Sequence, residues 1–207
     1  NAEYARDNQS FGLTTMRDSH VTFSGKRVHF EFRGKSGVDH DIDLDDPKLA
    51  KIVKQCQDLP GQELFGYINE KGKPVDVTSN DVNEYLHEIA GEEFTAKDFR
   101  TWNATVLAAK ALQEISTFDS QAQAKKNVLH AIEQVAKRLG NTRSVCRKCY
   151  IHPAVLDAYM DGSLLDTLQQ QATRELKNIA ALAPEEAAIL AFLQERLRRE
   201  ATRQSAK

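Results

Sequence analysis

A run of basic residues surrounds a single tyrosine in the second half of the chain. Between Gln134 and Leu156 there are five Lys or Arg residues and no acid, and Tyr150 lies within this run. The whole chain has a formal net charge of -2, so the positive charge is local. Ionising an unperturbed phenol at pH 7 costs roughly 4 kcal/mol, and nearby cations lower that cost. Tyr150 is therefore a candidate nucleophile toward a phosphodiester; the alternative is a core tyrosine whose hydroxyl is hydrogen-bonded.

Three further polar residues have types and positions suited to phosphate chemistry. Lys35 lies in a Gly-flanked turn, where it could bind phosphate or donate a proton, although hairpin lysines also serve to block edge pairing. Arg100 lies in the first turn of a predicted helix and offers a bidentate fork to phosphate oxygens; alternatively it pairs with an acid such as Asp98. Asn141 follows a glycine helix stop, so it is either a cap or an amide donor to phosphate.

Two cysteines and a histidine lie close to the tyrosine in the sequence. Cys146, Cys149 and His152 have the spacing C-x-x-C-x-x-H, which three zinc ligands or a redox pair could use. No second Cys pair completes a zinc set, and Cys56 is distant. We expect the two cysteines to be small helix residues that pack beside Tyr150, with no metal or other cofactor.

The elements that must position these residues begin with a small sheet. Apolar residues alternate along residues 20–44, with Val28, Phe30 and Phe32 on one face, and turns at residues 25–26 and 34–37 divide the segment into three strands. The second turn displays Lys35. We expect a three-stranded antiparallel meander, and therefore an α+β, predominantly α-helical fold.

The rest of the chain is expected to be mainly helical. Capping and breaking signals predict the following helices: 47–58, 79–90, 96–115 and 119–139, then short ones from 146 and 153, and finally residues from 163 with a last helix from 184. Residues 59–77 are rich in Gly and Pro and are expected to be a loop. Gly140 is expected to end the helix 119–139.

Composition places the chain among ordinary globular proteins. It has 207 residues, of which 41% are hydrophobic and 28% charged. No apolar stretch approaches the roughly 18 residues that span a membrane, and the first ten residues are polar, unlike a signal peptide. Three cysteines without secretory signals favour reduced thiols, and we expect a cytoplasmic, nucleoid location.

Four stretches together resemble the catalytic domain of type IB DNA topoisomerases, of the small bacterial and poxvirus kind. They are residues 11–17, 32–37 (Phe-Arg-Gly-Lys-Ser-Gly), 97–102 (Lys-Asp-Phe-Arg-Thr-Trp) and 140–144 (Gly-Asn-Thr-Arg-Ser), the last leading to Tyr150. Their order and spacing agree with the family over residues 1 to about 168. We therefore expect residues 1–168 to form the catalytic domain (meander 20–44, helical core 46–168) and residues 169–207 to form a C-terminal helical extension.

The resemblance implies a role for each polar residue. Tyr150 would attack one DNA strand and form a 3′-phosphotyrosyl link, and the strand would rotate and religate without ATP or metal. Arg100 matches an arginine that stabilises the pentavalent phosphorane, and Lys35 matches the general acid for the 5′-oxygen. Asn141 falls where poxvirus enzymes have a histidine, so a proton-carrying role is in doubt at that position.

Duplex DNA is the partner that the resemblance implies, bound by a protein expected to be a monomer. The residues predicted to contact DNA are Lys137, Arg143, Arg147, Lys148 and Tyr4. The family's other catalytic arginine would fall just before Asn1, so we expect this polypeptide to be a fragment with little relaxation activity. The alternatives are a tyrosine recombinase, which usually has His-x-x-Arg where this chain has Lys97-x-x-Arg100, and a non-catalytic DNA-binding module.

Overall fold

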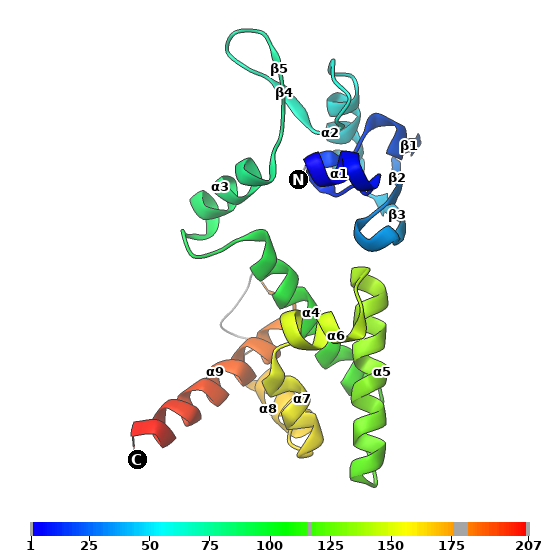
Figure 1. Ribbon diagram of the computed structural model, residues 1–207. Helices are drawn as coiled ribbons and strands as arrows, with labels where there is room; N and C mark the ends of the chain where they lie inside the picture. Colours follow the sequence, from blue (N-terminus) through cyan, green and yellow to red (C-terminus); the bar gives the residue numbers. More distant parts are fainter. Residues whose placement is uncertain (1, 116, 176–181, 206–207) are drawn as a thin grey trace. The chain divides into compact units, whose positions relative to one another are not determined.

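The computed structural model describes residues 2–115, 117–175 and 182–205, with the backbone alone at some of them, Tyr4 included. The chain forms two compact units, Asn1–Ala96 and Lys97–Lys207, which Figure 1 shows in blue to green and in green to red. The unit boundary falls inside the span predicted as one catalytic domain, and that domain assignment stays a prediction.

The first unit is built on the predicted meander. Its three strands pair antiparallel in the order β1 (Val21–Ser24), β2 (Arg27–Arg33) and β3 (Asp39–Asp45). The register places Val28 opposite Leu44 and Phe32 opposite His40. Val28 and Phe30 are buried and Phe32 is half-buried, as the alternation predicted. The predicted fold class, α+β and mainly helical with an N-terminal meander, is confirmed.

Helix α2 (Pro47–Gln57) supplies the other side of this small core. Its N-terminus is capped by Asp46, whose carboxylate accepts hydrogen bonds from the N–H groups of Lys48 and Leu49. Most of the buried apolar residues of the unit share one cluster: Met16, Val21, Val28, Phe30, Ala50, Val53 and Leu64. Short elements precede the sheet, namely α1 (Ala2–Asn8), η1 (Leu13–Thr15) and η2 (Asp18–His20), and η3 (Lys35–Gly37) forms the β2–β3 turn.

The segment predicted as a loop at residues 59–77 contains a hairpin, so that prediction was wrong. Strands β4 (Gly66–Ile68) and β5 (Pro74–Asp76) pair antiparallel, with Tyr67 opposite Val75. The turn is held by the side chain of Asn69, which accepts hydrogen bonds from the N–H groups of Lys71 and Lys73. The strands are too short for an alternating pattern, and their Gly and Pro residues suggested a loop. After them α3 (Ser79–Ala90) begins at the predicted Thr78–Asp81 capping box and ends at Gly91.

The second unit is wholly helical in the part that the structure describes. Its elements are α4 (Ala96–Ile115), α5 (Gln121–Leu139), α6 (Arg143–Val145), the π-helix η4 (Cys146–Tyr150), α7 (Pro153–Met160), α8 (Leu164–Glu175) and α9 (Pro184–Ser205). Ala108, Leu112, Ile132 and Tyr159 lie in one buried cluster with residues of α8 and α9. None of the described helices is both long and apolar enough to cross a membrane.

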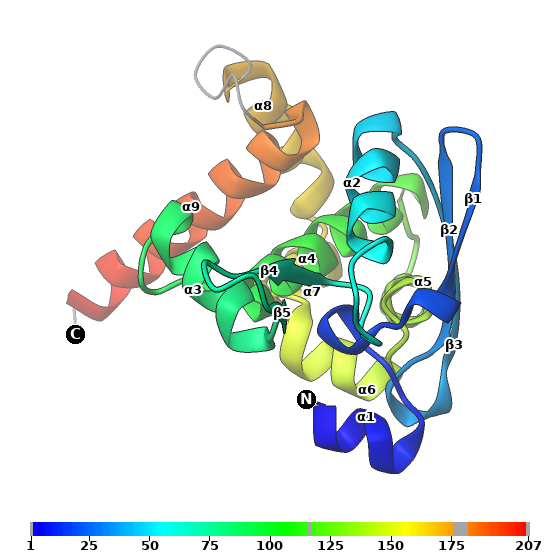
Figure 2. The ribbon, with the colours of Figure 1, turned by 90° about the horizontal axis from the view of Figure 1, so that it is seen from above.

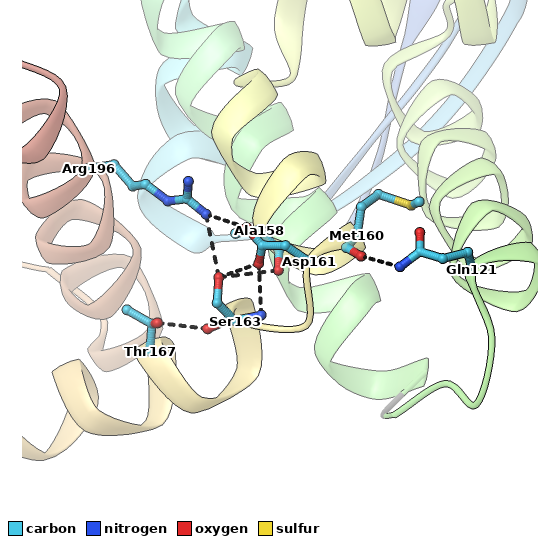
Figure 3. Close-up of polar contacts among 7 residues, drawn as sticks. All are labelled: Gln121, Ala158, Met160, Asp161, Ser163, Thr167 and Arg196. Carbon is cyan, nitrogen blue, oxygen red and sulfur yellow. Dashed lines mark hydrogen bonds and ion pairs between the residues drawn. The ribbon is translucent and has the colours of Figure 1, made fainter. Parts of the chain in front are cut away.

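Helix α9, in the segment predicted as a C-terminal helical extension, packs into this core. Figures 1 and 2 both show it alongside α8, and Ile189 and Phe192 are buried in the shared cluster. Figure 3 shows Arg196 of α9 pointing to the turn after α7, where its Nη2 lies 3.1 Å from Asp161 Oδ2. Burial raises the pKa of Asp161, but hydrogen bonds from Ser163 and the charge of Arg196 outweigh it and leave the pKa below its usual value.

Candidate active site

Tyr150 lies at the end of the π-helix, in a segment that Thr105 of α4 anchors. The N–H of Ile151 donates to the carbonyl of Cys146 at 2.9 Å, which closes the wide π turn. The buried hydroxyl of Thr105 accepts from the N–H of His152 at 3.1 Å. It also lies 2.8 Å from the carbonyl of Thr101 and 3.3 Å from that of Tyr150, either of which can accept its proton. The backbone around Tyr150 is therefore tied to α4.

Arg100 lies against the ring of this tyrosine. Its Cζ is 5.2 Å from the centre of the Tyr150 ring, a cation–π distance. Its Nη2 donates to the carbonyl oxygen of Leu139 at 2.5 Å. Its Nε is buried and has no hydrogen-bond partner among the described residues. Thus Nη2 of the arginine is already hydrogen-bonded, whereas its Nε–H can still donate to another acceptor.

The end of α5 fixes the third predicted residue, Asn141. Gly140 adopts the left-handed conformation (φ 63°, ψ 38°), and its N–H lies within reach of the carbonyls of Ala136 and Lys137. The N–H of Asn141 donates to the carbonyl of Ala136 at 2.9 Å, so the helix closes in a Schellman motif. The Asn141 amide then donates to the carbonyl of Leu139 at 2.9 Å.

The structure therefore brings three of the four predicted catalytic residues together in one unit. Arg100 and Asn141 donate to the same carbonyl of Leu139, and Arg100 stacks on Tyr150. The carbonyls at a helix C-terminus carry partial negative charge, which favours a guanidinium there. Asn141 caps α5, which is one of the two roles predicted for it, and its amide bonds the same carbonyl as Arg100. The arrangement offers a phenol beside N–H donors, as transfer of a phosphoryl group needs.

The cysteines beside Tyr150 have different surroundings. Cys146 is fully buried in the core, as expected for a packing residue, whereas Cys149 is exposed. Burial raises the pKa of the Cys146 thiol, although the charge of Arg100 acts in the opposite direction. His152 caps α7, since its Nδ1 accepts from the N–H of Ala154. Among the described residues, these three do not form a converging metal-ligand group.

The predicted DNA-contacting cations of this unit lie around the same site. Lys137 is in the last turn of α5, Arg143 is in α6, and Arg147 and Lys148 are in the π-helix. All four are exposed, and none is ion-paired with a described residue. They give the chain segment that leads to Tyr150 a local positive charge. The fifth predicted contact, Tyr4, lies in α1, and its side chain is outside the described part of the structure.

Lys35 belongs to the first unit, where it opens the tight turn between β2 and β3. It is exposed at the tip of the hairpin, as the sequence predicted. The sheet behind it carries a group that could hold a cation: His29 Nδ1 lies 3.1 Å from Asp43 Oδ1 and 3.7 Å from Asp41 Oδ1. These are largely exposed cross-strand neighbours, and hydrogen bonding between them accounts for their approach.

The residues that sequence reasoning missed are the ones that position the others. Thr105 carries the backbone of Tyr150 and His152, and the Leu139 carbonyl gathers Arg100 and Asn141. Neither belongs to a stretch whose spacing suggests chemistry. Thr105 could have been recognised as a buried polar residue, but only if the buried face of α4 were known.

One unit is helical and has an arginine packed on a tyrosine ring, and the other has a meander with a lysine at its tip. This combination fits the class that the motifs predicted, proteins that cleave DNA through a tyrosine. Residues 1–179 match the family described as eukaryotic DNA topoisomerase I, catalytic core, and the chain belongs to this family. The resemblance to type IB topoisomerases is thereby confirmed.

Viral DNA topoisomerases 1B are among the relatives. The protein from Acanthamoeba polyphaga mimivirus is 33% identical over 166 residues, which cover 77% of this chain and 49% of the viral protein. The protein from vaccinia virus (strain Copenhagen) is 23% identical over 182 residues, covering 86% of this chain and 54% of its own length. The chain thus spans about half the length of these relatives. Because both are viral, the likeness to bacterial enzymes stays a prediction.

Proposed function

We propose that the protein is a type IB DNA topoisomerase that cleaves one strand of duplex DNA through Tyr150. In this reaction the Tyr150 hydroxyl releases its proton to solvent as its oxygen bonds to phosphorus, the bond from phosphorus to the 5′-oxygen breaks, and a 3′-phosphotyrosyl link remains. The free strand rotates about the intact one and then religates. The ester bond is conserved in the link, so religation needs no ATP. Family membership and the names of the viral relatives support this reading.

The observation that carries the proposal is the packing of Arg100 on Tyr150 with a buried, unpartnered Nε. A phosphate oxygen would give that N–H an acceptor while its charge is met by the guanidinium. Asn141 supplies a second N–H donor, its side-chain amide, at the same helix end. Charge that develops on the phosphorane is offset by these donors, so the chemistry does not depend on a metal ion.

Lys35 is assigned the general-acid role in this proposal. As the 5′-oxygen leaves with the bonding electron pair, the Lys35 ammonium donates a proton to it, and in religation the same proton returns to the amine. Lys137, Arg143, Arg147 and Lys148 would contact the DNA backbone around the cleaved strand, because they are exposed cations close to Tyr150 in the chain.

A plasmid relaxation assay on the full-length protein tests this function. We expect supercoiled plasmid without recombination sites to be relaxed in the absence of ATP, and Tyr150→Phe to abolish relaxation. Tyr85→Phe is the matched control, since that exposed tyrosine lies in α3 of the other unit. Activity that requires paired recombination sites would instead indicate a recombinase. DNA binding with no relaxation in the native protein would indicate a non-catalytic module.

A further inference from the structure

The hairpin that carries Lys35 is closed by two backbone hydrogen bonds at its base. The N–H of Gly34 donates to the carbonyl of Val38 at 2.7 Å, and the N–H of Gly37 donates to the carbonyl of Gly34 at 3.1 Å. Lys35 directly follows Gly34, so its backbone position depends on how residue 34 is held. The turn itself is only three residues long, η3 (Lys35–Gly37), and leaves little freedom between these bonds.

Gly34 is glycine for reasons of space. Its φ of -91° and ψ of -174° form an extended conformation open to any residue. A Cβ atom at this position would clash with His40 Nε2 and would lie only 2.6 Å from His40 Cδ2. The imidazole therefore occupies the volume that a side chain at position 34 needs. Gly37 is different, because its φ of +73° disfavours any other residue on backbone grounds.

The ring of His40 is held in this position by the sheet. His40 pairs with Phe32 across β2 and β3, and the two rings stack with centroids 4.8 Å apart and an interplanar angle of 18°. Phe32 is half-buried and packs against the core cluster of the first unit. A continuous path of contacts thus runs from the core through Phe32 and His40 to the backbone of Gly34, next to Lys35.

We propose that His40 is a positioning residue for Lys35: its stacked ring fills the space above Gly34 and holds the hairpin that presents the lysine. The contact itself stands on the geometry of the first unit. Its catalytic consequence rests on the proposed function, in which the Lys35 ammonium protonates the leaving 5′-oxygen as the tyrosyl ester forms. Removal of the ring loosens residue 34 and misplaces that proton donor.

The catalytic consequence is tested with the full-length protein on two DNA substrates that differ in the leaving group. His40→Ala is expected to slow cleavage of ordinary DNA by about 10- to 100-fold, since misplacement by an ångström has effects of this size. A substrate with sulfur in place of the 5′-bridging oxygen releases a thiolate, which needs no proton, so its cleavage rate should be unchanged. His40→Phe keeps the stack on Phe32 and should restore the ordinary rate. Equal slowing on both substrates, or on neither, contradicts the positioning role.

Hydrogen exchange of the residue-34 amide tests the contact without DNA, and so separates it from the proposed function. We expect Gly34→Ala to speed this exchange by about tenfold or more, because overpacking must displace the ring or the turn. Adding His40→Ala should cancel the effect. Gly37→Ala is the control, since its strain lies in the backbone and against Arg33 rather than against His40, so the same second change should not cancel it. Failure of His40→Ala to rescue Gly34→Ala overturns the proposal, whatever the cleavage assays show.

Discussion

At the scale of single residues, the carbonyl oxygen of Leu139 organises the site. It is one of the last acceptors of α5, and both the guanidinium of Arg100 and the amide of Asn141 donate to it. The buried Arg100 Nε has no partner among the described residues, and an unsatisfied buried donor costs about 1–3 kcal/mol. In the proposed function a phosphate oxygen supplies the acceptor for this donor.

The first residue-scale prediction concerns Arg100. A lysine at this position keeps the charge but lacks the planar fork that bonds Leu139, stacks on Tyr150 and presents Nε. Arg100→Lys should therefore lower the single-turnover rate of DNA cleavage by about 10²–10³-fold. Arg138→Lys is the control, because Arg138 is exposed on α5 and should tolerate the change. Equal rates for the native protein and Arg100→Lys would contradict a role for the guanidinium.

The hydroxyl of Thr105 bonds the backbone of Tyr150 and His152. Thr105→Val keeps the shape but leaves the N–H of His152 without its acceptor, so we expect a loss of about 1–3 kcal/mol in the free energy of unfolding and slower cleavage. Urea denaturation and single-turnover kinetics measure the two effects. Thr101→Val is the matched control, since that hydroxyl donates to the carbonyl of Lys97 within its own helix. A similar loss in both variants would count against the anchoring role.

Sequence reasoning could select the residues with chemistry because their types and order form motifs. Tyr150, Arg100 and Asn141 were predicted in this way, and the structure brings them together. Thr105 could not be predicted, because its partner Tyr150 is 45 positions away and the contact depends on tertiary packing. The same holds for His40, whose ring lies over a glycine that the sequence presents as an ordinary turn residue.

At the scale of elements, the C-terminus of α5 is the feature that positions the site. The Schellman motif at Gly140 reverses the chain sharply, so that Asn141 faces back to Leu139 and the segment leading to Tyr150 can begin. A left-handed residue is needed for this reversal, and glycine takes that conformation without steric cost.

Gly140→Ala tests the role of this helix end. The left-handed conformation costs a residue with a Cβ about 1–2 kcal/mol, so stability should fall by that amount. Asn141 should also shift, so cleavage should slow along with the loss of stability. Gly162→Ala is the control: its φ of 80° carries a similar strain in open space, in the turn after α7. If Gly140→Ala loses as much stability as Gly162→Ala but cleaves DNA at the native rate, the helix end does not position the site.

Element boundaries were predictable where local chemistry sets them. Asp46 before Pro47, the Thr78–Asp81 box and Gly140 were read correctly because a cap acts within a few residues. The β4–β5 hairpin was missed, because its three-residue strands depend on pairing with each other and contain Gly66 and Pro74. The packing of α9 into the core could not be read from the sequence, because burial of Phe192 depends on helices far along the chain.

At the scale of the whole molecule, the distribution of charge matters more than its sum. The chain has a net charge of -2, yet four exposed cations lie in the segment that leads to Tyr150 and strand β3 is strongly acidic. Positive charge near Tyr150 favours a polyanion at that place, while the acidic face of the sheet disfavours one. The whole-chain value therefore argues neither for nor against DNA as the partner.

Salt dependence of DNA binding tests this distribution. Each phosphate contact contributes about 0.9 to the slope of log affinity against log salt concentration. Arg147→Ala and Lys148→Ala should each reduce the slope by about that amount and weaken binding uniformly across sequences. Lys51→Ala in α2, an exposed lysine of the other unit, should leave the slope unchanged. Unchanged slopes in the first two variants would remove these residues from the DNA contact surface.

The identity of the residue that becomes joined to DNA tests the central claim most directly. Full-length protein is incubated with a duplex whose cleaved strand loses its short 5′-hydroxyl piece by diffusion, so that the covalent intermediate accumulates. Protease digestion and mass spectrometry of the adduct should then place a 3′-linked nucleotide on Tyr150, and Tyr150→Phe should form no adduct. Attachment to any other residue, or a 5′-phosphate link, would contradict the account.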